Sequence, residues 1–228
     1  MTLIAHAITP APHPFLNTEG LRGRPLTWSA AGDIGLWSTD WDPADKLDRG
    51  DALEHHRLVE RICAGQPCLP VRFGTAFATE DAARASLESR TSALRAALDR
   101  VAGKSELAVT LLWNKNTGDS APQPPDSAGP GRRFMEERRR RYTARDAQRG
   151  RAADLVECLI AGLSVERALV WHDICTSEGV AVSLAVLVPT ERVLERKSEL
   201  ERLASGFDDV TGVVNGPWPP YSFARVDD

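Results

Sequence analysis

The C-terminal segment from Asn215 to Ala224 restricts the possible folds more than any other stretch of this sequence. Three of the four residues from Pro217 to Pro220 are prolines. Each proline holds φ near roughly −65° and removes a backbone hydrogen-bond donor. The residue before each proline is also pushed toward extended geometry. The segment can therefore be neither a helix nor a central strand. We expect a stiff, extended ribbon that holds Trp218, Tyr221 and Phe223 in a set arrangement.

Two roles are open for this ribbon. It could be an anchor that straps the tail of the chain onto its own core, since aromatic side chains bury large areas. It could also be a pre-ordered recognition surface for another protein, because a stiff segment loses little entropy when it docks.

The composition is that of an ordinary globular chain. The 228 residues are 42% apolar and 26% charged, with a formal charge of −4, so we expect no general attraction to nucleic acid or to an anionic membrane. The sequence shows neither an apolar run long enough to cross a bilayer nor the pattern of a signal peptide, which predicts a cytoplasmic protein. None of the four cysteines is spaced as a Cys-x-x-Cys motif, and we expect all of them to be reduced: Cys63, Cys68, Cys158 and Cys175.

The alternation of apolar and polar residues predicts two α+β domains. Residues 1–113 have strand, helix, strand, helix and strand patterns, typical of a mostly antiparallel sheet with helices on one face. Residues 114–130 break every period and contain four prolines, which predicts a linker or an exposed loop. Residues 131–228 follow the order helix, strand, strand, helix, strand, which is most of a ferredoxin-like unit closed by the ribbon.

Three local patterns in the first domain have testable consequences. Asp51 to Glu54 has the spacing of a capping box, and the helix that follows would bury His56 and turn His55 away from the core. Residues 68–77 alternate as a single strand. Thr79 then caps one helix whose buried positions are Ala83, Leu87, Leu94, Leu98 and Val101.

The residues that could carry chemistry do not assemble into an active site. His55 and His56 are adjacent on a helix, so their side chains diverge and cannot share one metal. On a strand, His172 and Asp173 face opposite sides, so they do not form a nucleophile–base pair with Cys175. We therefore predict no catalytic, metal-binding or cofactor-binding residues, and a chain that is not an enzyme.

An arginine-rich helix begins near Arg132. Its arginines are interrupted by Glu136 and Glu137, which can form intrahelical ion pairs with arginines three or four residues further on. We interpret it as a solvated face, or as one that meets an acidic protein partner.

Three segments, taken in order, resemble one known family. The first contains His55 to Glu60 and Leu69-Pro70-Val71-Arg72-Phe73-Gly74-Thr75. The second runs from Gly131 to Arg138, and the third is the ribbon from Gly216 to Ala224. Together they are similar to the F/L family of gas vesicle proteins.

The resemblance implies a fold and a role. It implies two α+β domains, the C-terminal one a modified ferredoxin-like fold. It also implies a non-enzymatic role at the gas vesicle or its assembly nucleus. Members act early in assembly and contact the small main shell protein and other accessory proteins, and some are minor shell components.

From the residues and the resemblance together we predict a partner-binding or bracing surface. Its residues are those of the two most specific segments: Arg72, Phe73, Gly74, Trp218, Pro219, Pro220 and Tyr221. An alternative is a small-molecule-binding or enzymatic ferredoxin-like protein with a cleft between its domains. A third is nucleic-acid binding through the helix from Arg132 to Arg145.

Overall fold

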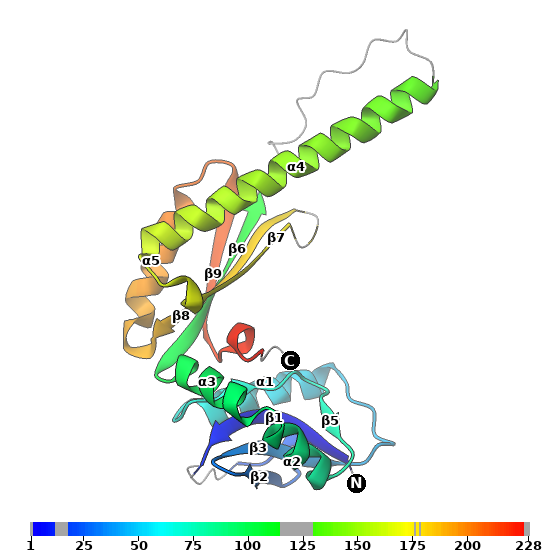
Figure 1. Ribbon diagram of the computed structural model, residues 1–228, viewed down its shortest axis with the longest axis vertical. Helices are drawn as coiled ribbons and strands as arrows, with labels where there is room; N and C mark the ends of the chain where they lie inside the picture. Colours follow the sequence, from blue (N-terminus) through cyan, green and yellow to red (C-terminus); the bar gives the residue numbers. More distant parts are fainter. Residues whose placement is uncertain (1, 12–17, 115–129, 176, 178, 226–228) are drawn as a thin grey trace. The chain divides into compact units, whose positions relative to one another are not determined.

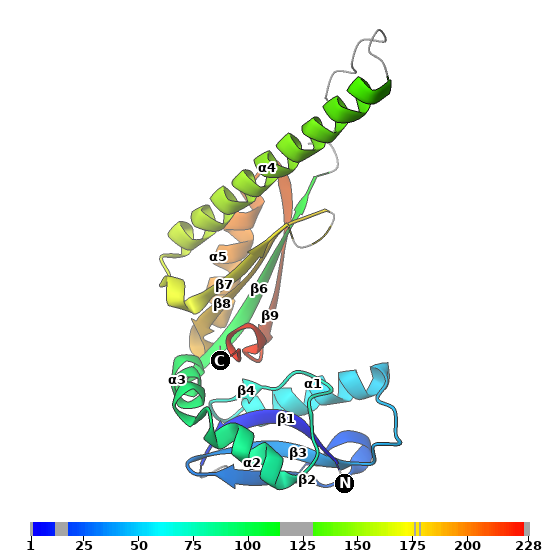
Figure 2. The same cartoon turned by 45° about the vertical axis from the view of Figure 1, so that its right-hand side comes forward.

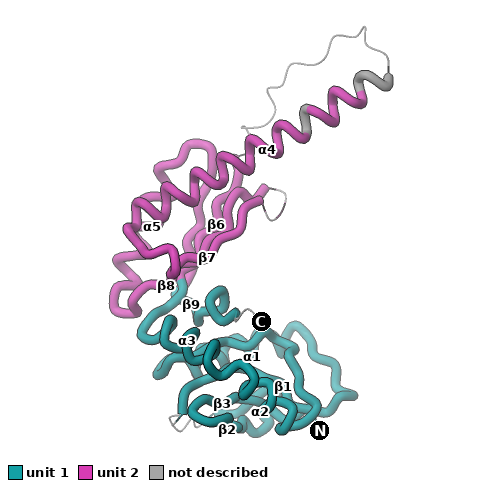
Figure 3. Tube along the Cα trace, in the orientation of Figure 1, with its two compact units in different colours: residues 1–106, 217–228 teal, residues 107–216 magenta. Residues whose placement is uncertain are grey.

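The structure, a computed structural model, describes residues 2–11, 18–114, 130–175, 177 and 179–225. It combines helices with two antiparallel sheets (Figure 1). Two compact units make up the chain: residues 1–106 together with 217–228, and residues 107–216 (Figure 3). These limits differ from the predicted boundaries at 113 and 131, and the division into domains stays a prediction.

The first unit contains a sheet in the order β2-β3-β1-β4, with β5 also paired to β1. The pairs are antiparallel, and a hairpin turn at Gly32 and Asp33 joins the second and third strands. Strand β1 is buried along almost its whole length, because it has neighbours on both edges and contacts with helices. The strands are β1 (Thr2–Pro10), β2 (Leu26–Ala31), β3 (Ile34–Trp41), β4 (Leu69–Pro70) and β5 (Ala76–Phe77).

Three α-helices accompany this sheet: α1 (Arg49–Cys63), α2 (Glu80–Glu88) and α3 (Thr91–Val101). The capping box of α1 is formed by Asp48 and Asp51, so the prediction that Asp51 opens the box was wrong by one turn. The buried face of α1 is correspondingly different: His55 is buried and His56 is half-buried, the reverse of the prediction.

The segment predicted as one strand over residues 68–77 is two short strands separated by a turn. Thr75 N donates to Arg72 O at 3.1 Å, and Gly74 takes a φ of +83° that favours glycine. Both sides of the turn are bonded to β1, through Val71 N to His6 O at 2.8 Å and Ala5 N to Thr75 O at 3.0 Å. The alternating pattern was therefore misread, because the turn depends on hydrogen bonds to a distant strand.

The predicted long helix is broken into α2 and α3 at Ser89 and Arg90. Thr79 is its N-cap as predicted, and its side chain accepts a hydrogen bond from Ala82 N at 3.1 Å. The five predicted core positions of the two helices are all buried.

Two cysteines correct the expectation that all four are reduced. Helix α1 ends at Cys63, and the chain returns to β4 within a few residues, so that the Cα atoms of Cys63 and Cys68 lie 5.2 Å apart. The two sulfur atoms form a disulfide. Cys158 and Cys175 are free thiols.

The second unit contains a sheet in the order β7-β8-β6-β9. Trp113 N donates to Gly179 O and Asn114 N to Asp209 O. The end of β6 thus lies beside the starts of β8 and β9, which makes these pairs antiparallel. The elements are β6 (Lys104–Trp113), α4 (Pro130–Leu163), β7 (Val170–Ile174), β8 (Val180–Pro189), α5 (Val193–Ser205) and β9 (Val210–Trp218).

The core of this unit lies between the sheet and its two helices (Figure 2). The helices approach closely at Gly162, where an added Cβ would lie 2.7 Å from Leu203 Cδ2. The C-terminal half of α4 supplies six buried residues: Ala152, Leu155, Val156, Leu159, Ile160 and Leu163. Among the described residues, no helix is both long and apolar enough to span a membrane.

Candidate partner-binding surface

The two most specific sequence segments lie together in the first unit, against helix α1. The ring of Phe73 lies edge-on to His55, with centroids 5.4 Å apart. On the neighbouring residue, His56, the rings of Trp218 and Tyr221 lie 5.4 and 5.9 Å away. Two adjacent histidines that were rejected as metal ligands therefore each contact one of the predicted segments.

The proline segment is not extended throughout. Trp218 ends strand β9, which is an edge strand, and Tyr221–Phe223 then form the short 3-10 helix η4, which packs against β4. Pro219 and Pro220 are buried. Trp218 remains 36% exposed. The prolines therefore act as an anchor while the tryptophan reaches solvent.

A buried carboxylate that sequence reasoning missed anchors η4. Ser222 donates twice to Glu106, from its backbone N at 2.8 Å and from its Oγ at 2.9 Å. Burial raises the pKa of Glu106, and the two hydrogen bonds from Ser222 oppose that rise. Glu106 looked like an ordinary strand-end residue, and only the return of the chain more than a hundred residues later supplies its partner.

Tyr221, His56 and Glu60 form a second polar contact on the same side of α1. Burial first, and then the charges of Glu60 and Glu106, raise the pKa of Tyr221 to about 12. The phenol is therefore protonated at neutral pH, and its hydroxyl lies 3.2 Å from His56 Nδ1. His56 Nε2 lies 3.6 Å from Glu60 Oε1. These contacts among Tyr221, His56 and Glu60 position the Tyr221 ring against α1.

A directed chain of hydrogen bonds lies behind the Arg72–Gly74 turn. Val71 O can only accept, so His55 Nε2 carries the hydrogen and donates to it at 3.1 Å. Burial lowers the pKa of His55, and its neutral Nδ1 accepts from His6 Nδ1 at 3.0 Å. His6 Nε2 then accepts from Thr39 Oγ1 at 2.8 Å, which itself accepts from Leu21 N at 3.3 Å.

This chain requires both histidines to be neutral. Burial, together with the proximity of His55, lowers the pKa of His6 to about 3. Since Val71 immediately precedes the turn, the chain holds Arg72 and Gly74 at the surface while Phe73 stays half-buried. The predicted residues of this segment are thus a supported turn with an exposed arginine.

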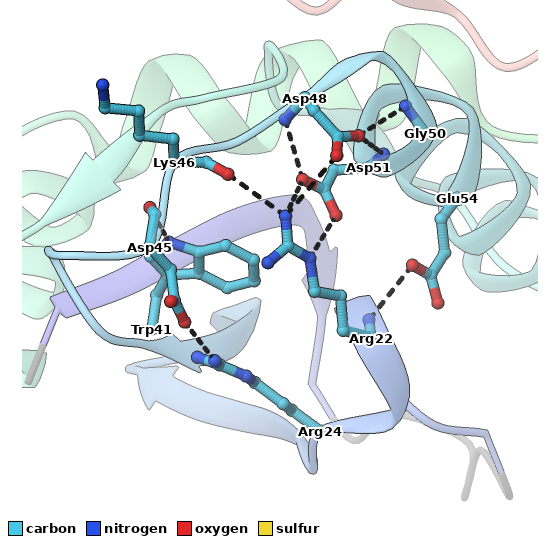
Figure 4. Close-up of polar contacts among 9 residues, drawn as sticks. All are labelled: Arg22, Arg24, Trp41, Asp45, Lys46, Asp48, Gly50, Asp51 and Glu54. Carbon is cyan, nitrogen blue, oxygen red and sulfur yellow. Dashed lines mark hydrogen bonds and ion pairs between the residues drawn. The ribbon is translucent and has the colours of Figure 1, made fainter.

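The start of α1 is held by Arg22, a residue that the sequence did not single out (Figure 4). Its guanidinium binds Asp51 in a bidentate manner, at 2.8 and 2.7 Å. Its backbone N donates to Glu54 Oε2 at 3.0 Å, in a left-handed conformation with φ +53°. The hydrogen bonds from Arg22 lower the pKa of the buried Asp51 carboxyl. A backbone strain rare for arginine is thus compensated by contacts with the first turn of α1.

Trp41 completes this cluster. The guanidinium carbons of Arg22 and Arg24 lie 5.0 and 4.4 Å from the centre of its ring, and Trp41 Nε1 donates to Asp45 O at 3.0 Å. Cation–π contacts of this kind hold the loop before α1 against the sheet. The sequence signal that could have located this end of the helix is Asp48-x-x-Asp51, an acidic variant of the capping box.

The other residues that were considered for chemistry and rejected lie in the second unit, not with the candidate residues of the first unit. His172 and Asp173 both lie exposed on β7 in the second unit. Across the described ranges, no group of three or more His, Cys, Asp or Glu side chains is placed to hold a metal ion. A shallow depression does follow the exposed side of α1, lined by Glu54, Arg57, Glu60, Arg61 and Ala64.

Comparison with known proteins places the chain. The sequence profile of the family described as "Gas vesicle synthesis protein GvpL/GvpF" matches residues 3–225. The chain belongs to this family. The predicted resemblance to the F/L family, which rested on the ribbon and the Leu-Pro-Val-Arg-Phe-Gly-Thr segment, is confirmed. The relatives are named for gas vesicles and not for a catalysed reaction.

Individual members agree with this assignment. Gas vesicle protein L2 of Halobacterium salinarum is 33% identical over 211 residues, covering 81% of this chain and 74% of the relative. Gas vesicle protein F2 of the same organism is 23% identical and covers 92% of this chain and 86% of its own length.

Two crystal structures of GvpF share the fold, each with a TM-score of 0.74. The protein from Microcystis aeruginosa is 16% identical and covers 98% of this chain and 99% of its own. The protein from Anabaena sp. PCC7120 is 18% identical and covers 100% and 99%. The mixed helix-and-sheet class with antiparallel sheets is therefore confirmed.

Proposed function

We propose that this member of the gas vesicle family is a non-enzymatic assembly protein. It binds the main gas vesicle shell protein, and other accessory proteins, during early vesicle formation in the cytoplasm. The family assignment supports a gas vesicle role. The finer statement is supported by the surface on α1, where a partly exposed tryptophan precedes two buried prolines and lies against the His56 ring.

The observation that carries the proposal is the contrast within the proline segment. Pro219 and Pro220 are buried, while Trp218, the last residue of β9, is 36% exposed. A tryptophan that is already fixed in place loses little entropy on binding, and such residues dominate interface energetics. Arg72 is exposed on the supported turn of the same unit and would supply a charged contact.

The test is co-expression of this protein with the main shell protein of the same organism, followed by purification through a tag on this protein. We expect a soluble complex, because an apolar shell subunit needs its exposed face covered before it polymerises. Trp218→Ala is expected to reduce the recovered shell protein by roughly tenfold, as for an interface hot spot.

Leu194→Ala is the matched control, since Leu194 is a large apolar residue with 81% exposure on α5. Unchanged recovery with that variant shows that loss of any exposed apolar group is not enough. Circular dichroism must show that Trp218→Ala is folded. If the folded variant recovers as much shell protein as the parent, Trp218 is not part of the binding surface.

We also propose that residues 107–216 form a ferredoxin-like unit. The order β6-α4-β7-β8-α5-β9 and the sheet order β7-β8-β6-β9 support this topology, in which the first and third strands are adjacent in the centre.

A further inference from the structure

The N-terminal half of α4 exposes the same helical stripe that its C-terminal half buries. At alternating intervals of three and four residues, the buried part of the stripe consists of Ala152, Val156, Leu159 and Leu163, each at most 2% exposed. Continued toward the N-terminus at the same intervals, the stripe consists of Met135, Arg138, Tyr142, Arg145 and Arg149, all exposed.

The reason for the change is geometric. Figures 1 and 2 both show the N-terminal half of α4 extending past the end of the sheet in the second unit. Met135 and Tyr142 are 62% and 55% exposed, so the described part of the chain does not cover either side chain. From Met135 to Arg149 the uncovered stripe is about 21 Å long at the rise of an α-helix.

The residues of this stripe alternate in kind. Met135 and Tyr142 are apolar or aromatic, and Arg138 and Arg145 lie between and after them. The guanidinium carbon of Arg138 lies 5.7 Å from the centre of the Tyr142 ring, and a shallow depression lies beside these two residues and Arg145. A seven-residue alternation of apolar and charged positions is the pattern that a partner helix can follow.

The positive charge of the N-terminal half of α4 favours an acidic partner. Residues 134–150 contain six arginines and three carboxylates, a formal charge of +3 in a chain whose net charge is −4. A second copy of this chain would bring arginine against arginine at the same stripe, which is unfavourable. A helix with carboxylates where this stripe has arginines would instead form charge-assisted pairs.

We propose that the stripe Met135–Arg149 is a docking surface for an amphipathic helix of an acidic partner protein. The partner's apolar residues would pack on Met135 and Tyr142, and its carboxylates would pair with Arg138 and Arg145. This surface lies in the second unit and is separate from the Trp218 surface of the first, so the proposal goes beyond the function proposed above. Failure of one leaves the other standing.

The binding test uses the full chain and a designed, fluorescently labelled peptide. The peptide has four heptads with leucine at position a and glutamate at position d, and the glutamates keep it from pairing with itself. Fluorescence anisotropy is expected to show saturable binding. Substituting glutamine for the glutamates of the peptide is expected to weaken binding by roughly tenfold, as loss of two or more charged pairs would.

Two double variants with equal change in charge locate the site. Arg138→Ala with Arg145→Ala removes two positive charges from the stripe and is expected to weaken peptide binding at least about tenfold. Thr143→Glu with Ala147→Glu lowers the charge by the same amount at exposed positions of the helix outside the stripe, and should change binding less than about threefold. Tyr142→Ala should weaken binding without altering charge.

The proposal is overturned if the peptide does not bind, or if both double variants weaken it equally, because attraction would then be nonspecific. It is also overturned if a single-stranded oligonucleotide of about 20 nucleotides binds more tightly with the same dependence on Arg138 and Arg145. Sedimentation that shows a dimer disrupted by Tyr142→Ala would assign the stripe to a second copy instead.

Discussion

The two units of this protein hold their cores together by different means. Among the described residues of the second unit, the buried side chains are all apolar. In the first unit, buried polar or charged side chains lie among the apolar ones, and they include His6, Thr39, Asp51, His55 and Glu106. An apolar core is insensitive to protonation, whereas a hydrogen-bonded core holds its parts in one arrangement only while each group keeps its protonation state. The candidate surface is built on the second kind of core.

The buried hydrogen bonds of the first unit also position the candidate surface. The histidine chain and the Glu106–Ser222 contact each join segments far apart in sequence. They end at Val71 and Ser222, which directly adjoin residues of the predicted surface. Directional bonds specify where the Arg72 turn and η4 lie, which apolar packing alone specifies less strictly.

The largest expected effect comes from breaking the apolar core. Leu159→Ala removes a fully buried side chain of α4 and should lower the free energy of unfolding by about 2–5 kcal/mol. The loss should be the same at pH 7 and pH 5, as measured by urea denaturation. The surface change Leu194→Ala should stay within about 0.5 kcal/mol. A Leu159→Ala loss that changed strongly with pH would contradict the contrast between the cores.

Acid should act on the first unit. Because the folded pKa of His6 is lowered to about 3, the unfolded chain binds the extra proton below about pH 6.5, and stability falls as the pH falls through this window. At pH 5 the loss due to His6 is about 2 kcal/mol at roughly 1.4 kcal/mol per pH unit.

Hydrogen exchange followed by mass spectrometry can assign this loss to a unit. Between pH 7 and pH 5, and after correction for the intrinsic rate, β1 and α1 should lose protection while β8 and α4 keep theirs. His6→Gln should reduce the pH dependence of β1. Equal loss of protection in both units would show that the buried histidines do not set the acid response.

A smaller effect is expected at the anchor of η4. Ser222→Ala removes one donor to Glu106 and should cost about 1–2 kcal/mol at pH 7. Burial raises the pKa of Glu106 in the folded protein, so stability falls as the pH rises from the ordinary carboxyl pKa toward the raised one. Loss of a hydrogen-bond donor to the carboxylate increases this cost of ionisation.

The deficit of Ser222→Ala should therefore shrink as the pH is lowered and Glu106 takes up a proton. Urea denaturation at pH 7 and pH 4.5, with Ser205→Ala on the exposed end of α5 as the matched control, measures it. A deficit that grew at the lower pH would show that Glu106 is not the acceptor that matters.

The parts of the fold that the sequence predicted correctly depend on local patterns. The Thr79 cap and the buried positions of α2 and α3 follow from residues close in sequence. The family resemblance likewise rested on contiguous segments. Neighbouring residues determine such features with little influence from the rest of the chain.

The errors fall where a distant partner decides. His55 is buried where its Nδ1 accepts a hydrogen bond from His6, and Asp51 is turned inward by Arg22. The strand predicted at 68–77 becomes a turn because β1 bonds to both of its sides. His6 lies more than forty residues from both α1 and the turn, so the periodicity of a local segment cannot reveal this partner. Arg22 is nearer to α1, but its left-handed conformation has no sequence signature.

The first unit is assembled from both ends of the described chain, with residues 107–216 lying between its two parts in sequence. During synthesis, His56 and Glu106 are therefore made well before Tyr221 and Ser222, their partners. At roughly 5–20 residues per second, the intervening unit occupies the ribosome for about 5–20 s. The second unit can complete its sheet as soon as β9 emerges, whereas the anchoring of Trp218 also needs Tyr221 and Ser222, which are made after β9. The surface proposed to bind the shell protein therefore forms only after residues 107–216 have been made.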